Sequence, residues 1–192
     1  MKKLVIILIL TLVVNSTNAQ SLPIFTDQLL QPSKDQPYKN FIAYEIDNLL
    51  FYNGDGKESK FFYIVDKAKG ARIFEFDEKD SKARRYAPRF FRAEGVDDIT
   101  IICVSLEHNY SWGTHIFIVE KGKVYHAGYI GYGADNFNFS MLALYCQFEK
   151  HEDHYIMFFQ EEVKIINYAT EKLISGKDLE FKVIKDKITR LK

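Results

Sequence analysis

Apolar and polar residues alternate with a period of two from Asn40 onward, which is the side-chain repeat of a β-strand with one buried face. The alternation is clearest in the segments "KFFYIVD", "ARIFEFD", "GTHIFIVE" and "KVYHAGYIG". Turn-forming residues separate most of these segments by the length of a hairpin connection. We therefore predict a mainly β fold, an antiparallel β-sandwich or barrel of about nine or ten strands, rather than alternating β/α units.

Three segments depart from this alternation and predict one or two short helices. The pattern near Thr26–Leu30 supports at most one short helix. The segment "EKDSKARRYAPRFFRAEG" (residues 78–95) predicts a short helix and an irregular excursion, because Pro88 interrupts it. The residues "YATEKLIS" near the C-terminal end allow a further helical turn.

The N-terminal residues have the order of a bacterial secretory signal. A basic start at residues 1–3 precedes an apolar run over residues 4–14, and a polar stretch then ends at the small residue Ala19. The apolar run is shorter than the roughly 20 residues that a membrane-spanning helix needs. We expect a periplasmic or secreted protein that is not inserted in the membrane after cleavage. The predicted divisions are a signal peptide (residues 1–19), a polar N-terminal lead (residues 20–39) and a single β-rich domain (residues 40–192).

Charge and composition narrow the classes of partner. The chain has 26 basic and 26 acidic side chains, so its formal net charge is zero. Proteins that bind nucleic acid or anionic membranes through electrostatics carry a basic excess, and we therefore expect neither partner. Aromatic residues make up 15% of the chain, mostly as Phe and Tyr, which favour strands.

The two cysteines, Cys103 and Cys146, each lie within an apolar run. In an oxidising compartment, a disulfide between them would close a loop of about 40 residues and contribute roughly 3–4 kcal/mol. The alternative is two separately buried thiols that behave as small apolar side chains. The sequence leaves both open, because it does not show whether the two Cβ atoms meet.

The tetrapeptide "HEDH" (His151–His154) combines two imidazoles with two carboxylates, which is a composition seen in metal sites. A four-residue loop at Lys150–Asp153 would place Phe148 opposite Tyr155 and keep apolar residues on one face of the hairpin. We therefore interpret the tetrapeptide as a charged hairpin turn that faces water. A metal site is the alternative, and it would need ligands held in place by their neighbours.

A second hairpin, centred between Lys121 and Gly122, brings two other histidines together. In its expected register Phe117 lies opposite His126, and His115 lies opposite Gly128. The side chains of His115 and His126 then become diagonal neighbours on one face of the sheet. The opposite face is more apolar and is expected to face the core; it carries Ile116, Ile118, Tyr125, Ala127 and Tyr129.

This histidine pair allows three interpretations: two ligands of a metal, a general acid and base, or polar residues on the half-exposed face of an antiparallel sheet. We favour the last, because the pair has neither the H-x-H nor the H-E-x-x-H spacing of a metal motif. Aromatic and glycine residues surround the hairpin and suit recognition of a ligand. The candidate ligand-binding residues are Tyr110, Trp112, His115, His126, Tyr129, Tyr132, Asp135 and Asn136.

The chain carries no recognisable catalytic motif. None of its serines lies in a G-x-S-x-G context, and both cysteines lie in apolar strands that disfavour a reactive thiolate. Our hypothesis is an exported, non-enzymatic β-domain without a cofactor that binds a protein partner or an envelope glycan through the aromatic and glycine-rich region. The alternative is a metal-dependent or general acid/base hydrolase that uses His115 and His126.

Overall fold

A computed structural model describes residues 22–28, 30, 32–33, 41–46, 48–54, 61–77, 85–107, 111–135 and 141–192. Strands dominate these residues, and every pair of neighbouring strands is antiparallel. The predicted mainly β, antiparallel fold is therefore confirmed. The predicted signal peptide, residues 1–19, lies outside the described residues.

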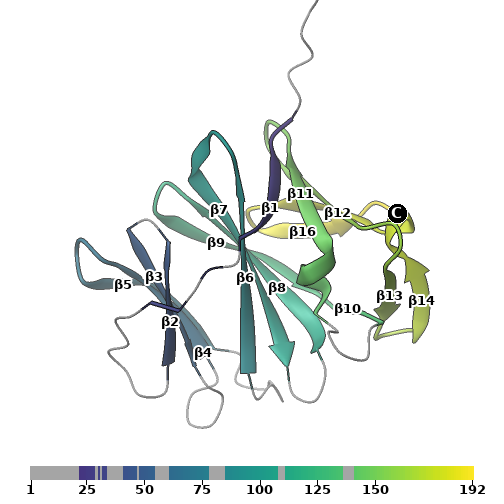
Figure 1. Ribbon diagram of the computed structural model, residues 1–192, viewed down its shortest axis with the longest axis horizontal. Coiled ribbons are helices and arrows are strands. Elements are labelled where there is room, and N and C mark those ends of the chain that lie inside the picture. Colours follow the sequence, from purple (N-terminus) through teal and green to yellow (C-terminus); the bar gives the residue numbers. More distant parts are fainter. Residues whose placement is uncertain are drawn as a thin grey trace, which may run out of the picture.

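A nine-stranded sheet forms the centre of the molecule (Figure 1). The sheet curls until its two edge strands lie side by side, and an added Cβ at Gly128 on one edge would lie 3.4 Å from Ile188 on the other. The sheet is thus nearly closed into a barrel. In spatial order its strands are β16 (Lys187–Arg190), β15 (Glu180–Ile184), β12 (Tyr155–Phe159), β11 (Cys146–Lys150), β1 (Ile24–Gln28), β6 (Arg85–Ala93), β7 (Val96–Glu107), β8 (Ser111–Glu120) and β9 (Lys123–Ile130).

Within the described ranges, two smaller sheets and two short 3₁₀ helices accompany the large sheet (Figure 1). One small sheet is a meander of β2 (Phe41–Ile46), β3 (Leu49–Gly54), β4 (Phe61–Asp66) and β5 (Ala71–Asp77). The other contains β10 (Tyr132–Ala134), β13 (Lys164–Asn167) and β14 (Lys172–Ser175). The 3₁₀ helices are η1 (Leu142–Tyr145) and η2 (Gly176–Asp178).

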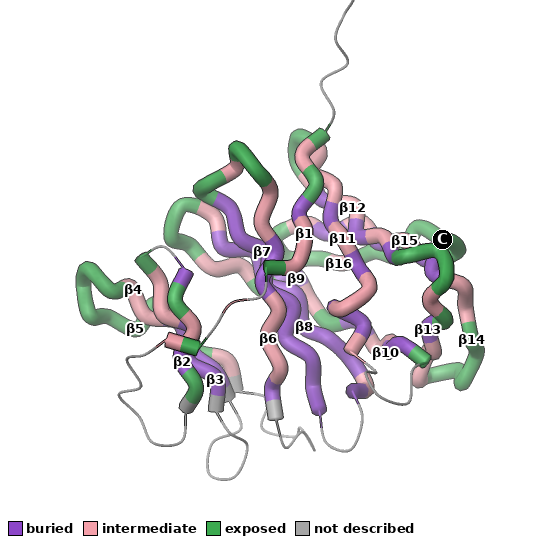
Figure 2. The backbone as a smooth tube through the Cα atoms, viewed as in Figure 1, coloured by how far each residue is buried: buried purple, intermediate pink, exposed green. Residues whose placement is uncertain are grey.

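The central strands β7 and β8 are buried on both faces (Figure 2). One face looks into the barrel, where Ile101, Ile116 and Phe148 belong to the larger core cluster. The other face is covered by the β2–β5 meander, and there Ile102 and Phe117 pack with Phe62 of β4 in a second cluster. Burial on both sides explains why "TIICVSL" in β7 is almost continuously apolar instead of alternating.

Where the structure describes the segments predicted as helical, it shows strands or a turn, and strand pairing explains the difference. Residues 29 and 78–84 of these segments lie outside the described residues. Ile24–Gln28 forms β1 between β11 and β6, because this position buries Phe25 in the barrel core. Residues 85–93 form β6, and Pro88 is tolerated there because, among the described residues, β1 pairs with this strand at Phe90–Arg92 and not at Pro88. Residues 172–175, the end of "YATEKLIS", form β14.

Candidate functional site

The "HEDH" tetrapeptide is the turn of the β11–β12 hairpin, as predicted. Its register differs from the expected one by two residues, because Phe148 pairs with Met157 and Lys150 pairs with Tyr155. The backbone N–H of His151 donates to the carbonyl of His154 across the turn, at 2.9 Å. A shift of two residues keeps the same side chains on the buried face, so both registers satisfy the apolar pattern.

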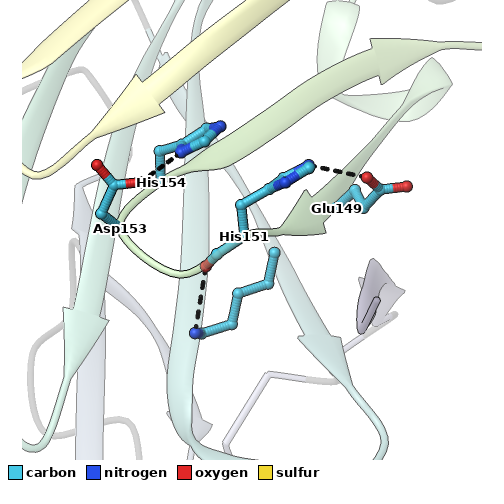
Figure 3. A network of polar contacts seen from close by, with 5 residues as sticks. Glu149, His151, Asp153 and His154 are labelled. Atoms are coloured by element: carbon cyan, nitrogen blue, oxygen red, sulfur yellow. Dashed lines mark hydrogen bonds and ion pairs between the residues drawn. The ribbon is translucent and has the colours of Figure 1, made fainter. Parts of the chain in front are cut away.

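The two imidazoles of this turn are held by different carboxylates (Figure 3). His151 Nε2 lies 2.8 Å from Glu149 Oε1, and His154 Nδ1 lies 2.7 Å from Asp153 Oδ1. The two rings stack with their centroids 4.7 Å apart. Within the part of the chain that the structure describes, no group of three or more His, Cys, Asp and Glu side chains is placed to hold a metal ion. The contacts of the turn are thus those of a local surface network.

A β-bulge changes the predicted register of the β8–β9 hairpin. Phe117 lies opposite His126 as expected, but Ile116 lies opposite Gly128, so one extra residue is inserted in β9. Gly128 has a φ of 143°, a conformation that side chains disfavour, and this glycine permits the bulge. Beyond the bulge, His115 lies opposite Tyr129 instead of Gly128. The prediction that Tyr129 faces the core is therefore wrong.

The expectation that both histidines lie on a half-exposed face of the sheet is wrong for His115. His115 is only 4% exposed, because the β2–β5 meander covers it. The ring of Phe76, on β5, lies 4.7 Å from the His115 ring and 5.3 Å from the His126 ring, centroid to centroid. Phe117 stacks on His126 at 4.7 Å. His115 thus lies beneath an aromatic layer, and His126 lies at its exposed edge.

The two imidazoles form one hydrogen-bonded pair. His115 Nδ1 lies 3.1 Å from His126 Nε2. Burial, together with the nearby His126, lowers the pKa of His115 to about 4. Burial also lowers the pKa of His126, although its hydrogen bond to the backbone of Gly128 opposes this. At neutral pH both rings are uncharged: His126 donates to the Gly128 carbonyl, and its Nε2 accepts the N–H of His115.

Tyr129 stands at the exposed side of this cluster in a fixed orientation. Its side chain is 45% exposed, and its ring centroid lies 5.0 Å from that of His115. The hydroxyl donates to the backbone carbonyl of Trp112 at 3.3 Å. The ring lies against Gly113, where an added Cβ would be only 2.1 Å from the hydroxyl oxygen. Glycine at position 113 therefore makes room for the tyrosine.

The remaining predicted residues divide between two regions. Trp112 packs against the second core cluster, which contains Phe117. Tyr132 belongs to β10 instead: its hydroxyl accepts hydrogen bonds from Asn167 and Arg190, at 3.1 and 3.2 Å. Asp135 donates its backbone N–H to the carbonyl of Lys164 at 2.7 Å, on the same small sheet. Tyr110 and Asn136 lie outside the described residues.

Phe76 is a member of the cluster that sequence reasoning did not select. Its segment "ARIFEFD" shows the alternation of a strand, but nothing in the segment predicts that the strand packs against His115 and His126. The contact joins β5 to β9, which are more than 40 residues apart in sequence, so only the packing of the meander on the large sheet reveals it.

Both cysteines are buried free thiols in the barrel core. Cys146 Sγ donates to the carbonyl of Ala143 at 3.7 Å. Burial and a hydrogen bond with the neighbouring Cys146 raise the pKa of Cys103 well above its ordinary value. The two sulfur atoms are thus neighbours, and the Cys103 thiol is protonated at neutral pH.

Comparisons with known proteins do not assign the chain to a family: no family model matches it, and no curated protein or solved structure matches it. Among the described residues, no helix has the length and apolar character needed to cross a membrane.

Proposed function

We propose that this protein is an exported, non-enzymatic domain that binds a protein partner through the aromatic face of the β8–β9 hairpin. This face consists of the exposed side chains of Tyr129 and His126, supported from beneath by His115, Phe76 and Phe117. The observation that carries the proposal is the fixed outward orientation of Tyr129, a large ring that is nearly half exposed.

An exposed and immobilised tyrosine suits an anchor in a protein interface. Tyr offers a large apolar ring with a polar tip, and such residues are enriched among the side chains that dominate binding energy. The hydrogen bond to Trp112 and the contact with Gly113 hold the Tyr129 ring before any partner arrives. Less conformational entropy is therefore lost on binding than for a mobile side chain.

The geometry of the histidine pair favours binding over the alternative of a hydrolase. His126 uses one ring nitrogen for Gly128 and directs the other at His115. His115 is buried beneath Phe76 and cannot reach a substrate in solution. A general base must lie within hydrogen-bond reach of the proton that it removes, and a metal ligand needs an available lone pair. The pair instead serves to support the aromatic face.

Affinity capture from an envelope extract of the source cell tests this proposal. Wild-type protein is immobilised beside two variants, Tyr129→Ala and the control Leu173→Ala. Leu173 is 54% exposed on β14, so its replacement removes a comparable apolar side chain from a different sheet. We expect at least one protein to be enriched by the wild type and by Leu173→Ala but lost with Tyr129→Ala. If no captured protein depends on Tyr129, the proposal is wrong.

A further inference from the structure

A cavity lies between the β2–β5 meander and strand β6. Neither His115 nor His126 lines it. Its volume is about 290 Å³, close to the lower end of the range for small-molecule sites. The meander contributes Ile42, Tyr44 and Asn53 to its wall, and Phe90 lies on β6. The Tyr44 and Phe90 rings pack together with their centroids 5.5 Å apart, so one side of the cavity is aromatic.

Asn53 supplies the most informative polar group in this wall. The residue is 4% exposed, and its side-chain amide donates to the backbone carbonyl of Tyr86 on β6. The amide oxygen, Oδ1, is also buried, but it accepts no hydrogen bond in the described structure. An unsatisfied buried acceptor costs about 1–3 kcal/mol. The Asn53 side chain thus joins the meander to β6 beside the cavity.

The charges at the cavity balance one another. Arg89 contributes to the wall, and its Nη1 lies 3.0 Å from Asp27 Oδ2. Because the guanidinium is paired with a carboxylate, the wall has little net charge to attract an anion or a cation. The amide of Gln28 adds a further neutral donor and acceptor. These groups favour a neutral ligand that both donates and accepts hydrogen bonds.

The edge of β6 disfavours one neutral ligand, an extended peptide. Among the described residues, strand β1 pairs with β6 at Phe90–Arg92 and does not extend along Ala87–Arg89. Pro88 lies in this stretch and has no backbone N–H. Strand β6 therefore lacks one of the backbone N–H donors that it would need to pair with an added peptide strand.

From this geometry we infer that the cavity is a binding site for one neutral sugar unit of a glycan. Sugar hydroxyls both donate and accept, so they can form hydrogen bonds with the Arg89 guanidinium and the Gln28 amide in the wall. The apolar face of the sugar ring lies against Tyr44 and Phe90. This site is separate from the aromatic face of the β8–β9 hairpin and does not depend on the proposed protein partner.

Ligand-observed saturation-transfer NMR with a panel of neutral mono- and disaccharides tests the inference, and titration calorimetry gives the dissociation constant. Two matched variants separate this cavity from the rest of the meander: Ile42→Trp, at a rim position that is 41% exposed, and Ile73→Trp, at a position on β5 that is 36% exposed. We expect at least one sugar to bind wild type and Ile73→Trp, and its dissociation constant to rise at least ten-fold in Ile42→Trp.

The remaining outcomes are decisive because each variant is checked for folding. The melting temperature identifies a variant that fails to fold, and Leu30→Trp, which also narrows the cavity, then replaces Ile42→Trp. Tyr129→Ala should leave sugar binding unchanged, so failure here and failure of the proposed protein partner are distinguishable. The inference is overturned if no sugar binds folded wild-type protein, if binding persists when the cavity is narrowed, or if a neutral tripeptide amide binds while the sugars do not.

Discussion

Gly113 and Tyr129 form a matched pair across the β8–β9 hairpin: the glycine leaves the space that the tyrosine ring occupies. An added Cβ at Gly113 would lie 2.1 Å from the Tyr129 hydroxyl and 2.4 Å from two ring carbons. The Tyr129 hydroxyl also donates to the carbonyl of Trp112, the residue before this glycine. The orientation of the exposed ring is thus set by the absence of a single carbon atom.

The variant Gly113→Ala should displace the Tyr129 ring without altering any exposed functional group. Because the new methyl overlaps the ring, the hydrogen bond to Trp112 should be lost and Tyr129 should become mobile. We expect capture of the protein partner to fall as far as it does in Tyr129→Ala. NMR relaxation of the Tyr129 ring checks the cause: an unchanged, ordered ring in Gly113→Ala would show that the glycine does not control its orientation.

The buried His115 should make stability depend on pH. Its pKa is about 4 in the folded protein and about 6.5 in the unfolded chain, so between these values the unfolded state binds more protons. The stabilisation is therefore complete above about pH 6.5 and is lost as the pH falls toward 4. The expected loss in the free energy of unfolding is on the order of 3 kcal/mol, because one pKa unit corresponds to about 1.4 kcal/mol.

Urea denaturation at pH 7.5 and pH 4.5 measures this loss, with His115→Leu as the control. The leucine cannot titrate. The difference in the free energy of unfolding between pH 7.5 and pH 4.5 should therefore be smaller in the variant than in wild type, by most of the loss expected from His115. His126 has a lowered pKa as well and contributes in the same direction in both proteins. An equal pH dependence in wild type and His115→Leu would contradict the burial of a neutral imidazole at this position.

The thiols of Cys103 and Cys146 should be protected from alkylation while the reduced protein stays folded. Both are buried in the barrel core, and the raised pKa of Cys103 leaves almost no thiolate to react. After reduction, iodoacetamide at pH 8 should leave both thiols unmodified in buffer and modify both in guanidinium chloride. Intact mass spectrometry counts the added groups; rapid labelling of either thiol in the folded protein would show that the core is more open than described.

Local alternation was enough to predict the antiparallel β fold, the two hairpins and the pairing of Phe117 with His126. It did not predict the burial of His115, because Phe76 reaches this residue from a distant strand. The orientation of Tyr129 was missed because a bulge breaks the period of two, and Gly128 alone does not reveal which residue is inserted. Local alternation did not predict strand β1, because its partners β6 and β11 lie roughly 60 and 120 residues away in the sequence.

The strength of binding between the purified protein and its captured partner tests the central claim most directly. We predict that Tyr129→Ala raises the dissociation constant by about 30-fold, the effect of losing roughly 2 kcal/mol at a dominant interface residue. Leu173→Ala should change it by less than about two-fold, since surface substitutions outside an interface have small effects. Equal dissociation constants for wild type and Tyr129→Ala, with the variant fully folded, would contradict the account.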